Sequence, residues 1–256
     1  MNRRSSFANL SLSLILICAF FLVNTSSSVA QRKPVYVLVH GAWGGGWAFK
    51  KTDSIMSAHG NEVHRASLTG QGERVHLSSA NIDLNTHIKD VVNMILYDNL
   101  KDVILLGHSY GGMVITGVAD SIPERIKKLI FLDAILPNDG ESLATSRGTA
   151  QNGPEQSAKD GFMVPQWVKA DAPAPKDFPQ SIKTFTQPVS FKNPVALKIA
   201  ATYILTVDPG KKPETDGFFS YGERAKKRGY KYLIMNADHN PQFNKSEELA
   251  ALLEKE

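Results

Sequence analysis

Residues 103–119 read VILLGHSYGGMVITGVA, in which two apolar runs flank a serine set between glycines. The uniformly apolar run 103–106 is typical of a parallel strand buried on both faces, and the apolar segment 113–119 predicts a helix. Gly107 to Gly111 fits the pattern G-x-S-x-G at the turn between them. A tight turn that strains the serine backbone leaves no space for neighbouring side chains, so glycines must flank it. The context predicts that Ser109 is a nucleophile held at the carboxyl end of a strand.

Further strands and helices are predicted on both sides of this turn, in alternation. Strand patterns cover residues 35–39, 61–66, 126–132, 203–207 and 232–235, and helical periodicity covers residues 47–58 and 84–96. Strands that alternate with helices at this spacing require a parallel sheet covered on both faces. The sequence therefore predicts the α/β class, with a mostly parallel sheet of about six strands flanked by helices.

The alternation stops between residues 137 and 194. This segment contains eight of the 13 prolines of the chain and few long periodic runs. Prolines interrupt both helices and central strands, so a loop-rich insertion is expected. We predict a small cap insertion over the sheet at about residues 137–194.

The first 30 residues have the pattern of a secretory signal peptide. Arg3 and Arg4 precede an apolar run from residue 10 to residue 23, and small residues lead to Ala30. We predict cleavage after Ala30, which leaves a single domain of residues 31–256, exported to the periplasm or secreted. The alternative is an uncleaved membrane anchor, because the run approaches spanning length if Ala8 is counted. After cleavage, no stable membrane insertion is expected.

Charge and cysteine content exclude several classes of protein. Removing Arg3 and Arg4 from the formal net charge of +4 leaves +2, which is too balanced to indicate a nucleic-acid partner. Cys18 is the only cysteine and lies inside the apolar run. The mature chain would then contain no cysteine, which excludes thiol catalysis and cysteine-ligated metals. No metal site is predicted.

A nucleophilic serine needs a base, and the base needs a carboxylate that fixes its tautomer. His239 lies in the loop after the last predicted strand, and enzymes with this motif have the chain order serine, acid, histidine. The other six histidines lie before the nucleophile or, as with His108, beside it. His239 is therefore the predicted base.

Three aspartates are candidates for the acid. Asp208 directly follows the strand 203–207, so its side chain is expected to project toward the histidine loop. Asp133 competes with it, because it also ends a strand and some proteins with this motif place the acid there. Asp238 adjoins His239 in sequence and is expected to point elsewhere. Asp208 is the predicted acid, with Asp133 as the alternative.

Backbone amides are predicted to stabilise the oxyanion. The turn supplies the amide of Tyr110, and the glycine-rich loop after the first strand supplies that of Ala42. The glycines at 44–46 lack the Lys-Ser/Thr continuation of a phosphate-binding loop and the spacing of a dinucleotide fingerprint. No nucleotide cofactor is therefore expected.

Four segments carry a resemblance to a known family: 40–47 (HGAWGGGW), 107–112 (GHSYGG), 206–208 (TVD) and 237–239 (ADH). Together they resemble the α/β-hydrolase group that contains plant methylesterases, hydroxynitrile lyases and many bacterial carboxylesterases. The resemblance implies the α/β-hydrolase fold, an enzyme without cofactors and Asp208 as the acid. Hydroxynitrile lyases differ, because they carry a lysine where this chain has Asn240 and a threonine where it has Gly41. The resemblance therefore implies ester hydrolysis rather than cyanohydrin cleavage.

The expected function is hydrolysis of a small or medium carboxylic ester, a small-molecule substrate, through an acyl-enzyme intermediate. Candidate substrate-binding residues are Trp43, Phe162, Met163 and Trp167, although aromatic residues in a cap can equally serve packing. Two alternatives stay open: a cofactor-free lyase on the same residues, and a binding protein that has kept the fold without turnover.

Overall fold

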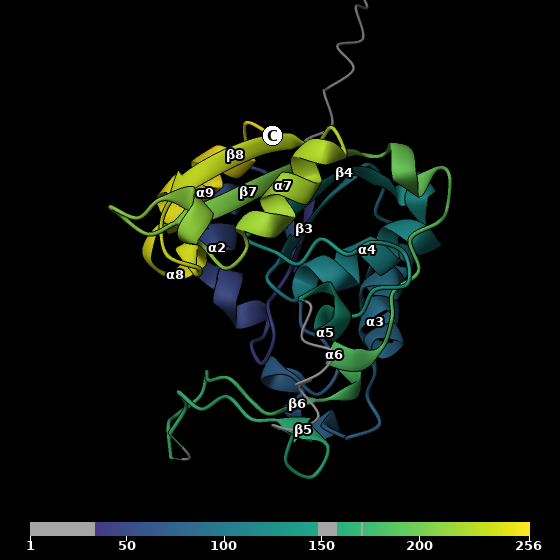
Figure 1. Cartoon of the computed structure of the whole chain (residues 1–256), viewed down its shortest axis with the longest axis vertical. Coiled ribbons are helices and arrows are strands. Elements are labelled where there is room, and N and C mark those ends of the chain that lie inside the picture. The colour runs from purple at the N-terminus through teal and green to yellow at the C-terminus, as the bar shows by residue number, and fades with distance from the viewer. Residues whose placement is uncertain (1–33, 148–157, 170) are drawn as a thin grey trace, which may run out of the picture. The chain divides into compact units, whose positions relative to one another are not determined.

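A six-stranded parallel sheet lies at the centre of the computed structural model, which describes residues 34–147, 158–169 and 171–256 (Figure 1). The strand order is β2-β1-β3-β4-β7-β8, and every neighbouring pair is parallel. The strands are β1 (Val35–Val39), β2 (Glu62–Ala66), β3 (Val103–His108), β4 (Ile126–Leu132), β7 (Ala200–Val207) and β8 (Lys231–Asn236). The predicted α/β class with about six parallel strands is confirmed.

Helices cover both faces of the sheet, as the alternation of side chains along β1 shows. Val35, Val37 and Val39 pack into one apolar cluster, with residues of α3 (Leu84–Tyr97), α4 (Gly111–Ser121) and α7 (Phe219–Lys227). Tyr36 and Leu38 point to the opposite face and pack with residues of α2 (Lys50–Ala58) and α9 (Ser246–Leu253). Since successive side chains of a strand alternate between faces, each buried strand contributes to two separate cores.

The segment predicted as a cap contains only short elements in its described part. After β4 come α5 (Leu143–Ser146), β5 (Phe162–Met163), β6 (Gln180–Ser181) and α6 (Lys183–Thr186). β5 and β6 form an antiparallel pair apart from the main sheet (Figure 1). We call the residues 133–199 between β4 and β7 the insertion. In Figure 1 the pair of β5 and β6 lies below α3 and α4.

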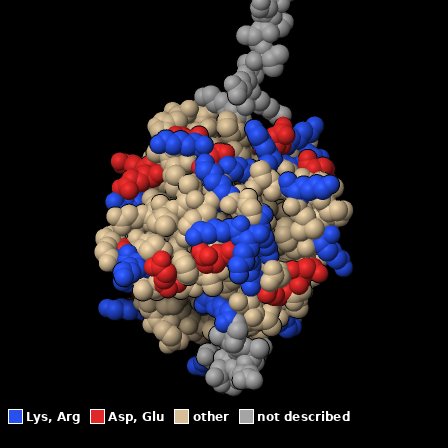
Figure 2. Space-filling model, turned by 45° about the horizontal axis from the view of Figure 1, so that its top comes forward, with Lys and Arg blue, Asp and Glu red and all other residues tan. Residues whose placement is uncertain are grey.

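The surface carries charges of both signs. Figure 2 shows Lys and Arg side chains interspersed with Asp and Glu on the face that it displays. Some form ion pairs, such as Lys226 Nζ with Glu223 Oε1 at 2.7 Å. Such pairs on a solvated surface contribute little to stability.

The predicted signal peptide, residues 1–30, lies outside the described residues, so cleavage and export stay predictions. In the part of the chain that the structure describes, no helix combines the length and the apolar character needed to cross a bilayer.

Candidate active site

Ser109 lies at the turn between β3 and α4 with a φ of 53°, in the left-handed region that non-glycine residues rarely adopt. A β-carbon on Gly107 would lie 2.5 Å from the carbonyl oxygen of Gly111. A β-carbon on Gly112 would lie 2.0 Å from the carbonyl oxygen of Ile135. Neither position tolerates a side chain without movement of the backbone, so the two glycines permit the close approach that strains Ser109.

Backbone hydrogen bonds hold this strained turn against the end of β4. The Ser109 amide donates to the Leu132 carbonyl at 3.3 Å. The Ser109 carbonyl accepts from the amides of Gly112 at 3.1 Å and Ile135 at 3.0 Å. The position of the serine therefore depends on the chain that follows β4 as well as on its own turn.

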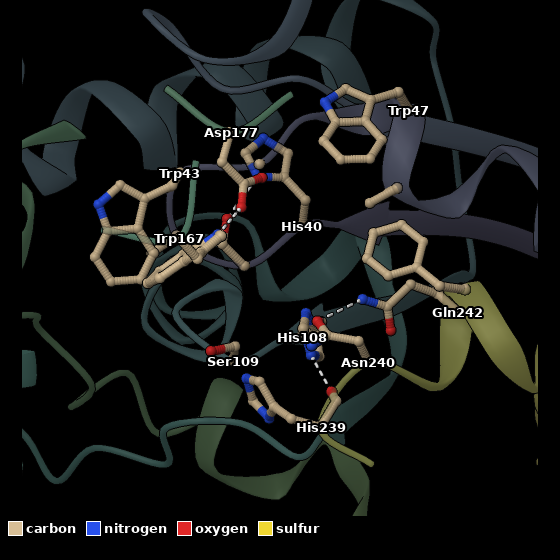
Figure 3. A pocket seen from close by; sticks show the side chains of 15 residues that line it. His40, Trp43, Trp47, His108, Ser109, Trp167, Asp177, His239, Asn240 and Gln242 are labelled. Carbon is tan, nitrogen blue, oxygen red and sulfur yellow. Dashed lines mark hydrogen bonds between the residues drawn. The ribbon is translucent and has the colours of Figure 1, made fainter. Parts of the chain in front are cut away.

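His239 follows β8 and lines the same cavity as Ser109. Figure 3 shows its imidazole beside the Ser109 side chain. Its Nδ1 donates a hydrogen bond to Asp133 Oδ2 at 2.6 Å, which leaves Nε2 as the nitrogen able to accept a proton. The ring also stacks on Phe218 at 4.7 Å between centroids, and the His239 carbonyl accepts from His108 Nε2 at 2.7 Å. These contacts fix both the orientation and the tautomer of His239.

The carboxylate partner of His239 is Asp133, a buried residue with only 1% of its surface exposed. Its second oxygen, Oδ1, accepts from the Thr206 amide at 3.1 Å. Two charge-assisted hydrogen bonds therefore satisfy a carboxylate that would otherwise be costly to bury.

The structure contradicts the prediction of Asp208 as the acid. Asp208 points to solvent, with 40% of its side chain exposed, and its carboxylate pairs with Lys211 Nζ at 2.5 Å. A turn explains the direction, because the Lys211 amide bonds the Asp208 carbonyl at 3.0 Å and draws the chain away from the histidine loop. β4 and β7 are neighbours in the sheet, so an aspartate after either strand is plausible from sequence. The three-dimensional structure selects the earlier strand, which was the alternative.

The predicted oxyanion donors are both available. Within the described residues, neither the Ala42 amide nor the Tyr110 amide donates to a protein acceptor. His40 orients the first of them, because its Nδ1 donates to the Gly41 carbonyl at 2.7 Å and the Ala42 N–H of the same peptide points the opposite way. His40 Nε2 accepts from the Leu68 amide at 3.2 Å, so this ring is neutral.

The insertion holds the same loop through Trp43, which has a φ of 66°. The Trp43 amide donates to Gln180 Oε1 at 2.8 Å, and its carbonyl accepts from the Phe178 amide at 2.9 Å. The Trp43 indole Nε1 donates to the Met163 carbonyl at 2.9 Å. Three bonds to one strained residue next to Ala42 therefore couple the insertion to the predicted oxyanion donor at Ala42.

Two buried histidines support the site in their neutral forms. Burial lowers the pKa of His40 to about 4 and that of His87 to about 4. His87 Nε2 donates to the Thr69 carbonyl at 3.0 Å, and its Nδ1 accepts from the Tyr110 hydroxyl at 2.9 Å. Protonation of either ring would place a buried charge beside the residues that carry the oxyanion donors.

This burial predicts a loss of stability in mild acid. An unfolded histidine has a pKa near 6.5 and binds protons more readily than these folded ones, so the stability present at pH 7 falls as pH drops from about 6.5 to about 4. At pH 5 each of His40 and His87 should lower the free energy of unfolding by about 2 kcal/mol relative to pH 7. Urea unfolding at pH 7 and pH 5 measures this loss of stability. Between the two pH values, the free energy of unfolding should fall less in His87→Gln than in the wild type. An equal loss in both proteins would contradict the role of His87.

A cavity of about 530 Å³ opens above Ser109 and His239 (Figure 3). The predicted substrate-binding residues Trp43 and Trp167 line it, but Phe162 and Met163 do not. These two form β5 instead, where the Met163 carbonyl serves as the acceptor for Trp43. Their place in a hairpin with β6 is a long-range pairing that the sequence pattern did not reveal.

Several residues line the cavity although no sequence pattern singled them out: Trp47, Asp177, Gln242 and Phe243. Trp47 stands at the start of a helical pattern, which gives no sign that its side chain faces a cavity. Asp177 lies in the proline-rich insertion, where no pattern distinguishes one polar residue from another. No group of three or more His, Cys, Asp or Glu residues able to hold a metal ion is found in residues 34–147, 158–169 and 171–256.

Comparisons with known proteins agree with this geometry. The model of the alpha/beta hydrolase family matches residues 36–252. A solved structure, an extracellular alpha/beta-hydrolase from a Paenibacillus species, superposes with a TM-score of 0.70 at 22% identity, covering 87% of this chain and 98% of that one. At that identity the likeness concerns the fold alone.

Two curated relatives are similar in sequence over part of their length. A carbendazim hydrolyzing esterase from Nocardioides sp. (strain SG-4G) is 53% identical over 108 residues, which are 42% of this chain and 45% of that protein. Methylesterase 1 from Arabidopsis thaliana is 30% identical over 117 residues, which are 45% of this chain and 44% of that protein. The matches thus span less than half the length of either relative.

Proposed function

We propose that this chain, which belongs to the alpha/beta hydrolase family, is a serine esterase that cleaves small or medium carboxylic esters. The observation that carries the proposal is the arrangement around Ser109. A strained nucleophile, a histidine oriented by the buried Asp133 and two free backbone amides surround one cavity. Nucleophile, base, acid and oxyanion donors together are the requirements of acyl transfer.

In the first half of the reaction, Ser109 Oγ attacks the ester carbonyl carbon while His239 Nε2 accepts the hydroxyl proton. The imidazolium that forms is stabilised by Asp133, whose carboxylate bonds Nδ1 at 2.6 Å. The Ala42 and Tyr110 amides donate to the oxyanion of the tetrahedral intermediate. As the intermediate collapses, His239 gives its proton to the departing alkoxide, and the acyl group stays on Ser109.

In the second half, water replaces the alcohol in the cavity. His239 accepts a proton from the water as its oxygen attacks the acyl carbon, and the same two amides hold the second oxyanion. Collapse breaks the bond to Ser109 Oγ, which recovers its proton from His239. The products are a carboxylic acid, an alcohol and the original enzyme.

Degree of identity favours an esterase over a lyase, because an alpha-hydroxynitrile lyase from Arabidopsis thaliana is also similar but only 34% identical over 110 residues, 42% of this chain. Both curated relatives reported above carry esterase names, and the more similar of them is 53% identical in the matched region. Gly41 supports the same conclusion. Hydroxynitrile lyases carry a threonine at this position, whereas in this chain a β-carbon on Gly41 would lie only 3.1 Å from Ser109 Cβ.

The test is hydrolysis of p-nitrophenyl esters by the purified protein. We expect saturable turnover of the acetate and butyrate and a decline in kcat/KM at dodecanoate, because the cavity holds only about 530 Å³. Folded protein that hydrolyses none of these esters would refute the proposal. Release of cyanide from a cyanohydrin without ester turnover would establish the lyase instead.

A further inference from the structure

All three tryptophans of the chain line the Ser109 cavity. Trp43 belongs to the oxyanion loop, Trp47 to the 3-10 helix Gly46–Phe49 and Trp167 to the insertion. Trp43 and Trp167 meet edge to face, with 5.1 Å between ring centroids and 89° between planes. Figure 3 shows these two rings together on one side of the cavity, close to Asp177. Trp43 and Trp167, from segments far apart in sequence, therefore form an aromatic wall on one side of the cavity, and Trp47 lies apart from them.

Asp177 is the carboxylate of this wall. Its Oδ2 accepts from Trp167 Nε1 at 2.8 Å, whereas Oδ1 has no protein donor within the described residues. Oδ1 faces Gly44, and a β-carbon on that glycine would lie 3.8 Å from it. Gly44 and Asp177 both line the cavity, so Oδ1 borders it beside this glycine. Partial burial raises the pKa of the Asp177 carboxyl, and a bound cation would lower it again.

No positive charge neutralises Asp177 in the cavity. Among the described residues that line it there is no Lys or Arg. Three imidazoles also line it: burial lowers the pKa of His40 and His108, so both are neutral at pH 7, and His239 has Asp133 as its carboxylate partner. A carboxylate with a free oxygen beside two indole rings is therefore the dominant charge of the site. Aromatic faces and carboxylates attract the same kind of group, one that is electropositive.

We propose that Asp177, Trp43 and Trp167 form a subsite for an electropositive nitrogen of the substrate, either a cation or an N–H donor. This inference rests on the proposed esterase function, because the nitrogen is part of the ester substrate. Binding at the subsite does not itself require turnover. Substrates with a negative charge in the same position are disfavoured, because Asp177 repels them.

Four aryl acetates test the subsite, because with an acetyl group only the aryl alcohol is large enough to fill the cavity. The 3-(trimethylammonio)phenyl ester carries a positive charge but no N–H group. The 3-aminophenyl ester has an N–H group but no charge, and the 3-carboxyphenyl ester carries a negative charge. The 3-tert-butylphenyl ester is the neutral isostere of the first. For each protein, the kcat/KM of each ester is divided by the kcat/KM of the tert-butyl ester. These ratios are then compared between wild type and Asp177→Asn, so that differences in the intrinsic reactivity of the esters cancel.

We expect Asp177→Asn to lower the ratio for the trimethylammonio or the aminophenyl ester roughly tenfold. The ratio for the carboxyphenyl ester should rise in the same variant. Asparagine keeps an oxygen for Trp167 Nε1, which limits structural effects. Asp171→Asn, which removes a charge from an exposed position of the insertion, is the matched control and should keep the wild-type ratios. Ratios that are the same in Asp177→Asn and wild type for all esters would overturn the proposal.

A binding measurement separates this inference from the esterase proposal. 3-(Trimethylammonio)phenol and 3-aminophenol are each titrated into Ser109→Ala and into Ser109→Ala/Asp177→Asn, with tryptophan fluorescence as the readout. We expect at least one of the two phenols to bind roughly tenfold more weakly to the double variant. That result supports the subsite even if no ester is hydrolysed, whereas equal binding of both phenols to the two proteins overturns it even if esters are.

Discussion

Replacing Ser109 with alanine is expected to lower kcat for ester hydrolysis by about 10⁶-fold, which would leave little more than background. The reason is that no other described residue can take over the covalent step at the strained turn between β3 and α4. The oxyanion donors and the cavity persist in the variant, so substrate binding should change little. Steady-state rates with p-nitrophenyl butyrate and calorimetric binding of a slow ester analogue measure the two effects.

Ser121→Ala is the matched control for this substitution. Ser121 lies at the end of α4, where its hydroxyl donates to the Gly117 carbonyl at 2.7 Å, far along the helix from the turn. The control should hydrolyse ester at the wild-type rate. If Ser109→Ala kept a large part of the activity, another nucleophile would have to exist, and the assignment of Ser109 would fail.

Asp133→Asn is expected to lower kcat by about 10⁴-fold, whereas Asp208→Asn should leave kcat within about twofold of wild type. An asparagine at position 133 can donate to His239 Nδ1, which selects the tautomer with its proton on Nε2. That nitrogen then faces Ser109 as a donor and cannot act as a base. Asp208 contacts Lys211 at the surface and has no contact with the histidine through which to act.

The two aspartate variants also control each other, since both remove one carboxylate after neighbouring strands of the sheet. Circular dichroism and thermal unfolding should establish that Asp133→Asn remains folded before its kinetics are interpreted. Full activity in Asp133→Asn together with inactive Asp208→Asn would restore the sequence-based assignment of Asp208. Loss of activity in both would indicate that the loop after β7 contributes to the site indirectly.

Local patterns were sufficient to predict the sheet and the turn that holds Ser109. The β3 strand, its glycines and the start of α4 are adjacent in sequence, so one segment contains the whole steric argument for the position of Ser109. The place of His239 in the loop after the last strand was also predictable. The parallel order follows from strands that alternate with helices.

The acid and the cavity wall depend on contacts between distant segments, which the sequence does not display. Asp133 and Asp208 each end a strand, and only the turn at Lys211 shows that Asp208 faces solvent. Asp177 lies in an insertion without periodic pattern and acquires its place through Phe178, whose amide bonds the Trp43 carbonyl. Long-range hydrogen bonds of this kind specify position without leaving a local signal.

Ser109 is expected to carry the acyl group during ester hydrolysis. The most direct measurement is rapid quenching of the enzyme with p-nitrophenyl acetate, followed by mass spectrometry of the peptide that contains residues 103–119. We predict one added acetyl group on Ser109 in the wild type. In His239→Ala, the same acetyl group should form at a greatly reduced rate. An enzyme that hydrolyses the ester with an unmodified Ser109, or with the acetyl group on another residue, would contradict the account.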